Sequence, residues 1–161
     1  MADQGSGRDE SEQERLDRNL SELLQELRVA LPGVQVLFAF LLTVPFQTGF
    51  QNPTSFQERV YFATLVCTAV SAALLIAPTA YHRLLFRFQE KEQLVFIANR
   101  FAIVGLGFLA LAMVGAIMLI TDVIFGATST VIVATVCAFL LYASLWYLLP
   151  LRRRFRSRRE I

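Results

Sequence analysis

Residues 101–120 read FAIVGLGFLALAMVGAIMLI, a stretch of 20 residues without a charged side chain. An α-helix rises about 1.5 Å per residue, so a stretch of this length matches the roughly 30 Å hydrocarbon core of a bilayer. A helix packed on the outside of a soluble domain would need a polar face, and this stretch has none. It therefore predicts a helix that crosses a membrane.

Three other runs have the same character and lie at 34–50, 60–80 and 131–149. The whole chain is 55% hydrophobic, with a mean hydropathy of +0.52, which excludes an ordinary soluble domain. The sequence predicts an all-α polytopic membrane protein in which four transmembrane helices form an antiparallel bundle. The predicted transmembrane domain is 31–149, with spans at about 31–51, 59–80, 100–121 and 130–149.

The basic residues are unequally divided between the two sides of the predicted bundle. Four spans place the N-terminus, the 81–93 connector and the C-terminus on one side, and Arg59 is the one basic residue on the other side. Short cytoplasmic loops carry an excess of Lys and Arg. Both termini are therefore expected in the cytoplasm.

The second span is expected to leave the lipid within APTAYHRLLFR, residues 77–87. His82 has no Cys, Asp or Glu at metal-ligand spacing, so it is interpreted as an interfacial residue, with pH sensing left open. Aromatic and basic side chains at such positions contact the headgroup region. The predicted lipid and topology anchors are Tyr81, Arg83, Arg87, Arg100, Arg152, Arg153 and Arg154.

The predicted spans contain neutral polar and small residues at regular spacing, but no Asp, Glu, Lys or His. An intramembrane ionisable residue is the usual mark of an ion pathway, and small residues mark close helix packing. No catalytic, cofactor-binding or metal-binding residue is predicted. A 4-3-4-3 spacing instead predicts two packing seams, while a polar stripe lining a water path is the alternative. The predicted packing residues are Thr64, Thr68, Ser71, Ala102, Gly105, Ala112 and Ala116.

The two ends of the chain differ in chemistry. Residues 1–13 are acidic and expected to be disordered, and 14–30 form an amphipathic cytoplasmic helix that Pro32-Gly33 separates from the first span. Its leucine stripe is flanked by acidic side chains, so we expect it to dock on protein near the 81–93 connector rather than on anionic lipid. The docking residues are Leu16, Leu20, Leu23, Leu24 and Leu27.

The tail 150–161 contains six arginines directly after the last span. Arginines in this position attract anionic lipid headgroups, and they also anchor the topology. The tail is too short to predict binding to nucleic acid. The expected partners are therefore the lipid bilayer with its anionic headgroups, and a second copy of the chain or another membrane protein.

Three stretches carry a resemblance to a known family: RNLSELLQELRVALPGVQVLFAFLLTVPF, APTAYHRLLFR and ANRFAIVGLGFLALAMVGAIMLITDV. They resemble a family of small actinobacterial membrane proteins of unknown function, and the resemblance covers residues 14–150. It implies a bacterial inner-membrane protein with this topology. Some relatives carry the label sodium/proton antiporter. No catalytic residues are carried over, and small proton-coupled exporters rely on an intramembrane carboxylate that this chain lacks.

Two classes of function are compatible with these features. The first is a non-enzymatic scaffold or a regulatory or accessory membrane protein. The alternative is a small oligomeric transporter or channel resembling a cation/proton antiporter. The absence of an intramembrane carboxylate favours the first class. An enzyme is not expected, because the sequence has neither a nucleophile–base pair nor a metal cluster.

Overall fold

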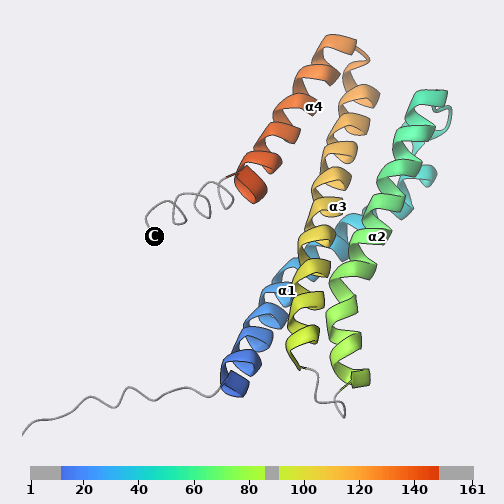
Figure 1. The fold of residues 1–161 in the computed structure, drawn as a ribbon. Helices are drawn as coiled ribbons and strands as arrows, with labels where there is room; N and C mark the ends of the chain where they lie inside the picture. Colours follow the sequence, from blue (N-terminus) through green and yellow to red (C-terminus); the bar gives the residue numbers. More distant parts are fainter. Residues whose placement is uncertain (1–11, 86–90, 149–161) are drawn as a thin grey trace, which may run out of the picture.

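The computed structural model describes residues 12–85 and 91–148, and this part of the chain contains helices and no strands. Four long helices run antiparallel to their neighbours along the chain (Figure 1). The predicted all-α architecture with four spans is confirmed. The helices are α1 (Glu12–Thr43), α2 (Ser55–Leu85), α3 (Lys91–Phe125) and α4 (Thr128–Ala143). Shorter turns are the 3-10 helices η1 (Val44–Phe46) and η2 (Thr48–Phe50) and the π-helix η3 (Ser144–Leu148).

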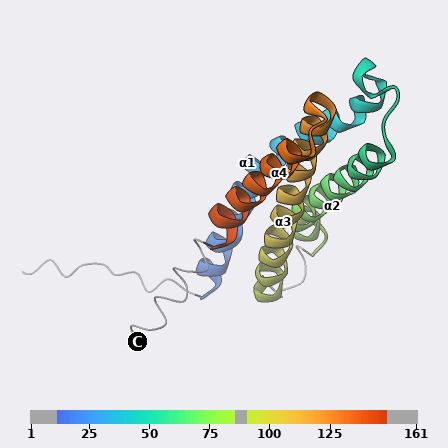
Figure 2. The ribbon, with the colours of Figure 1, turned by 90° about the horizontal axis from the view of Figure 1, so that it is seen from above.

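The helices are not arranged equivalently around one axis. Helix α3 lies between α2 and α4, and α1 crosses α2 and α3 (Figures 1 and 2). Within the described residues, α4 makes its contacts with other long helices mainly to α3. One long side of α4 and one of α1 therefore face outward.

The centre of the bundle is a cluster of Leu27, Val34, Leu75, Ala102 and Leu109, all buried. Helix α1 enters it through a seven-residue repeat, since its buried residues Leu20, Leu27, Val34 and Leu41 are 6%, 4%, 0% and 3% exposed. A seven-residue repeat keeps one side of a helix against its neighbours along a left-handed crossing. The repeat runs without interruption from Leu20 to Leu41.

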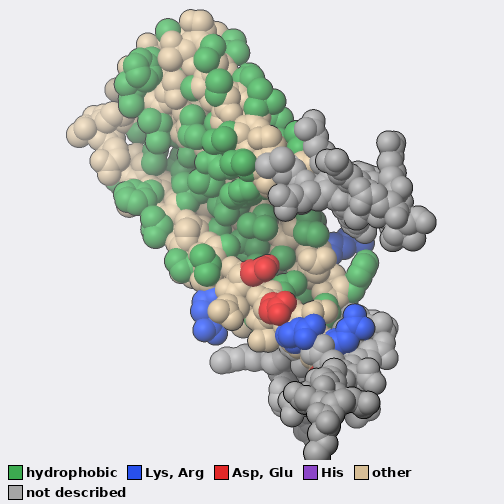
Figure 3. All heavy atoms as spheres, turned by 90° about the vertical axis from the view of Figure 1, so that its left-hand side faces the viewer, with side chains coloured by type: hydrophobic (Ala, Val, Ile, Leu, Met, Phe, Trp, Pro, Cys, Tyr) green, Lys and Arg blue, Asp and Glu red, His purple; other side chains and the backbone are tan. Residues whose placement is uncertain are grey.

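The outer surface is apolar over most of its length. Phe40, Phe62 and Phe96 are 68%, 65% and 68% exposed. On the face in Figure 3, charged side chains gather near the end where α1 begins, and hydrophobic side chains cover most of the rest. Such a surface would be unfavourable in water but is the ordinary surface of a protein in lipid.

Helix α1 corrects the predicted break at Pro32-Gly33. The structure has one helix from Glu12 to Thr43, with Pro32 inside it. Proline removes the N–H that would donate to the Arg28 carbonyl, and the cost of this loss is smallest at an exposed residue such as Arg28, at the end of the apolar run. The apolar repeat on both sides of Pro32 keeps the helix packed. The leucine stripe is therefore a continuation of the first span.

The first span also ends earlier than expected. Helix α1 stops at Thr43, before the predicted limit at residue 51, and η1 begins with Val44-Pro45. The Leu41 carbonyl would normally accept from the N–H of residue 45, which is a proline and has none. Tyr61 of α2 supplies the missing donor, with its hydroxyl 3.1 Å from the Leu41 oxygen. This bond holds the end of α1 against the start of α2.

Candidate functional site

The contact between α2 and α3 is formed by the polar seam of α2. Thr64, Thr68, Ser71 and Leu75 are 3%, 0%, 0% and 0% exposed, and Pro78 is also buried. The Thr64 hydroxyl donates to the Val60 carbonyl at 2.7 Å, and the Thr68 hydroxyl donates to the Thr64 carbonyl at 2.8 Å. Both hydroxyls thus bond within their own helix, which leaves their donors unavailable to a water path.

Ser71 is different because its hydroxyl bonds across helices. It donates to the Gly105 carbonyl of α3 at 2.8 Å. This approach requires a glycine, since a Cβ at residue 105 would lie 2.8 Å from Leu75 Cδ2 and 3.2 Å from Leu74 Cβ. Close backbone approach through small residues is the usual way in which helices associate in lipid.

The small-residue side of α3 faces this seam and α1. Ala98, Ala102, Leu109 and Ala112 are 1%, 9%, 8% and 0% exposed. Gly105 is also buried, and Ala116 is half-buried. The interior built from these residues is close-packed and contains no charged side chain within the described part of the chain.

Two glycines of α3 lie outside the predicted seam and also mark close approaches. A Cβ at Gly115 would overlap the Thr64 hydroxyl, and one at Gly107 would lie 2.8 Å from the Tyr147 hydroxyl. The sequence signal for both was present, because glycine weakens a helix and its presence in a span indicates a close neighbour. Which neighbour approaches was not readable from the sequence.

Tyr147 fastens the end of the fourth span to α3. Its hydroxyl donates to the Ile103 carbonyl at 3.0 Å. Tyr147 belongs to the π-helix η3, and the half-buried Trp146 beside it packs against the central cluster. A π-helix changes the direction of the side chains that follow it. Here it places Trp146 and Tyr147 on the side of the fourth span that contacts α3.

At the opposite end of the bundle, Gln57 joins the start of α2 to the end of α3. Its backbone N–H donates to Thr54 Oγ1 at 3.2 Å, and Thr54 N–H donates to Gln57 Oε1 at 3.0 Å. This reciprocal pair is a capping box. The amide Nε2 of Gln57 donates to Asp122 Oδ2 at 2.9 Å. Sequence reasoning missed this contact, although T-x-x-Q before an apolar run is a recognisable signal for a helix start.

The docking residues of the N-terminal helix lie along the buried side of α1. Leu20 and Leu27 are buried, and Leu23 and Leu24 are half-buried. The side chain of Leu16 lies outside the described residues. Charged side chains occupy the other sides of this segment and are exposed, namely Glu14, Arg15, Arg18, Glu22, Glu26 and Arg28. The N-terminal half of α1 therefore has one side held by the bundle and a charged surface facing outward.

The predicted anchors fall only partly within the described residues. Tyr81 is 41% exposed, and its ring lies 5.9 Å from that of Phe101, so the end of α2 contacts the start of the third span. Arg100 is exposed on α3. Arg87, Arg152, Arg153 and Arg154 lie outside the described residues, as do the side chains of His82 and Arg83. The basic tail 150–161 also lies outside the described residues. Of the segment 1–13, which is predicted to be disordered, only residues 12 and 13 are described, and they belong to α1.

The described residues contain no group of three or more His, Cys, Asp or Glu side chains that could hold a metal ion. Cys67 on α2 is half-buried and Cys137 on α4 is exposed, and both are free thiols. Within the described residues, the arrangement offers packing surfaces between the helices and a charged exposed surface on the N-terminal half of α1.

Four helices are long and apolar enough to cross a membrane: Arg18–Phe46, Ser55–Tyr81, Val95–Phe125 and Thr128–Leu148. The fold and the apolar outer surface therefore define a polytopic membrane protein. More narrowly, the chain belongs to a family of unknown function (DUF6328), whose family model matches residues 9–150. This confirms the part of the resemblance that placed the chain in a family of unknown function. No curated protein and no solved structure matches the chain.

Proposed function

We propose that this protein is a non-enzymatic accessory or scaffold protein of the bacterial inner membrane, with both termini in the cytoplasm. In this proposal the N-terminal half of α1 presents a charged surface to a protein partner. The observation that carries the proposal is the continuity of α1 combined with the burial of Leu20 and Leu27. A docked, continuous helix holds its exposed side chains in a defined arrangement, which favours recognition at low entropic cost.

The charge of this surface favours a protein over lipid. Glu22 and Glu26 are exposed one turn apart, and the Glu22 carboxylate lies 3.8 Å from Arg18 Nε. Surface helices that bind anionic lipid carry mainly Lys and Arg opposite their apolar side. The segment from Glu12 to Arg28 extends about 24 Å along the helix axis, long enough for a partner to bind.

The packed interior argues against the transporter alternative. The hydroxyls of Thr64, Thr68 and Ser71 each donate a hydrogen bond to a backbone carbonyl. Coupled cation transport usually uses a charged or histidine side chain within the membrane, and the sequence between Val60 and Ala80 has no Asp, Glu, Lys, Arg or His. The same holds for 101–120, which supports a structural role for α2 and α3.

The proposed orientation predicts a labelling pattern in whole cells. Cysteines are introduced singly into a variant whose own two cysteines are replaced by alanine. An impermeant thiol reagent should label cysteine at Asn52 or Ser129, both exposed at the end of the bundle opposite the start of α1. It should label cysteine at Gln25 only after the cells are permeabilised. Labelling at Gln25 in intact cells would reverse the orientation.

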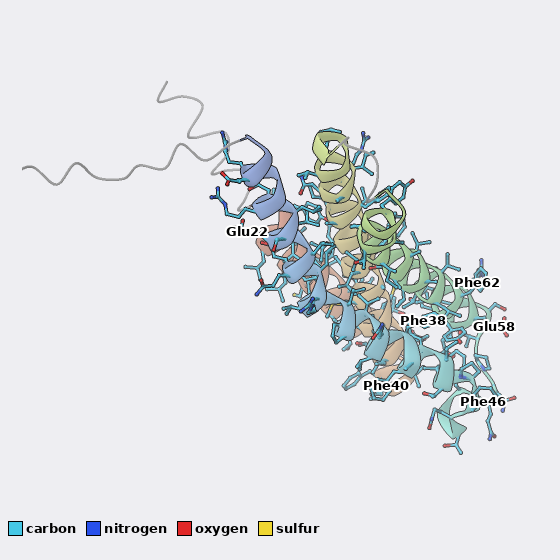
Figure 4. The ribbon with its side chains drawn as sticks, turned by 90° about the horizontal axis from the view of Figure 1, so that it is seen from below. Glu22, Phe38, Phe40, Phe46, Glu58 and Phe62 are labelled. Atoms are coloured by element: carbon cyan, nitrogen blue, oxygen red, sulfur yellow. The ribbon has the colours of Figure 1, made fainter. Side chains whose placement is uncertain are left out.

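The partner surface is tested with a photo-crosslinking amino acid at Glu22, compared with the same group at Phe62. Figure 4 shows these residues well apart, on α1 and α2. After irradiation of native membranes, Glu22 should give a discrete adduct with one other protein, and Glu26→Lys should lower its yield. Phe62, 65% exposed on the apolar surface, should not give that adduct.

A matched flux measurement separates the two classes of function. Proteoliposomes with an imposed pH or sodium gradient should lose that gradient no faster than protein-free vesicles. Cation flux that increases with the amount of reconstituted protein would contradict the proposal, as would equal adducts from Glu22 and Phe62.

A further inference from the structure

We propose that the outward side of α1 around Gln35 is the interface of a parallel homodimer, in which the Gln35 amides of two copies hydrogen-bond to each other. This goes beyond the cytoplasmic partner surface. It requires only that α1 crosses the membrane, whether or not the charged N-terminal half binds another protein.

Gln35 lies near the middle of the membrane-crossing part of α1. Towards one end is the exposed Arg28, and towards the other is Leu41, whose carbonyl accepts from Tyr61 in the second turn of α2. Gln35 is seven residues from Arg28 and six from Leu41, or about 10 Å along the helix from either. It is also the only polar side chain in the sequence between Arg28 and Thr43.

The Gln35 side chain is exposed and has no hydrogen bond to another described residue. The hydroxyls of Thr43, Thr64, Thr68 and Thr121, in contrast, each donate to a carbonyl of their own helix. A primary amide has two N–H donors and a carbonyl acceptor, and hydrocarbon satisfies neither. An outward Gln35 at this depth therefore indicates a polar partner inside the membrane.

A second copy of the chain is the partner that this chemistry selects. An amide is complementary to itself, because the donors of one can bond the carbonyl of another. Two copies in the same membrane orientation, related by a two-fold axis along the membrane normal, bring both Gln35 side chains to the same depth. Pro32, Val36 and Ala39 are exposed on the same side of α1, and the small Ala39 permits close approach.

The test is disulfide crosslinking in native membranes, with Cys67 and Cys137 replaced by alanine. Ala39→Cys lies one turn from Gln35, while Phe40→Cys lies about 140° around the helix from it. Phe40 is 68% exposed, so a low crosslinking yield at position 40 would not be caused by burial of that side chain. With Gln35 intact, an oxidant should convert Ala39→Cys into a covalent dimer several times more efficiently than Phe40→Cys.

Replacing the amide then tests its role. Gln35→Leu should lower the dimer yield of Ala39→Cys by about 3- to 30-fold, the range expected for losing interhelical hydrogen bonds in a membrane. Gln35→Asn, which keeps the amide, should retain more of the yield. Equal yields at 39 and 40, no effect of Gln35→Leu, or adducts only with a different protein would each overturn the homodimer. The thiol-labelling pattern at Asn52, Ser129 and Gln25 reports membrane insertion independently.

Discussion

Gly105→Leu is expected to lower the midpoint of thermal unfolding in mild detergent by roughly 2–12 °C, since overpacking costs about 1–3 kcal/mol and each kcal/mol shifts the midpoint by about 2–4 °C in a chain of this size. The reason is the lack of space between α2 and α3. Even a Cβ at this position would lie 2.8 Å from Leu75 Cδ2 and 2.9 Å from Leu75 Cγ. Leu75 is 0% exposed and belongs to the central cluster with Val34 and Leu109, so displacing it would disturb those contacts.

The longer side chain would also separate the Ser71 hydroxyl from the Gly105 carbonyl, now 2.8 Å apart. Gly105→Ala should have a smaller effect of the same sign. The matched control is Gly33→Leu, because nothing lies within 4 Å of a Cβ added there. Both changes replace glycine by leucine within a helix, so the gain in helix propensity is shared. Equal midpoints for the two leucine variants would show that α2 and α3 do not approach closely at Gly105.

Leu27→Asp should release the N-terminal half of α1 from the bundle. Leu27 is 4% exposed and belongs to the cluster with Val34, Leu75 and Ala102. Truncating a buried leucine to alanine costs about 2–5 kcal/mol, and a carboxylate adds the penalty of burying a charge. Among the described side chains upstream of residue 27, Leu20 is buried and Leu23 and Leu24 are half-buried, so Leu27 is one of a few that hold this segment.

Limited trypsin digestion of the purified protein measures this release. Cleavage after Arg15, Arg18 and Arg28 should be slow in the parent protein and much faster in Leu27→Asp. Gln25→Asp is the control, because Gln25 is exposed and the change adds the same carboxylate without removing an apolar contact. Gln25→Asp should be cut as slowly as the parent. If Leu27→Asp is cut no faster than these two proteins, the segment is not docked. If Leu27→Asp has the same size distribution in detergent as the parent, its transmembrane part remains folded.

The proposed homodimer and the docked segment use different sides of α1. Leu20, Leu27 and Val34 face the bundle, whereas Gln35 and Ala39 face outward. A change at Leu27 should therefore alter proteolysis without abolishing crosslinking at position 39. A change at Gln35 should lower crosslinking at position 39 without altering proteolysis of the N-terminal half of α1. This separation allows each surface to be tested without disturbing the other.

Helix content, the number of spans and their apolar faces were readable from the sequence. The physical reason is that a backbone in lipid must satisfy its hydrogen bonds within its own segment, so a long apolar run has one stable conformation. The residues spaced 4-3-4-3 in 60–80 and 98–116 are also those that lie buried or half-buried between α2 and α3, since this spacing places them on one side of a helix.

Tertiary structure alone decided which groups meet. Pro32 is tolerated because α1 packs on both sides of it, a consequence of contacts with α2 and α3 that the local sequence does not contain. The neighbours of Gly107 and Gly115, the Tyr61 bond to Leu41 and the Gln57 bond to Asp122 join residues far apart in the chain. Periodicity determines which side of a helix is buried, but the crossing of two helices determines the partner of each residue.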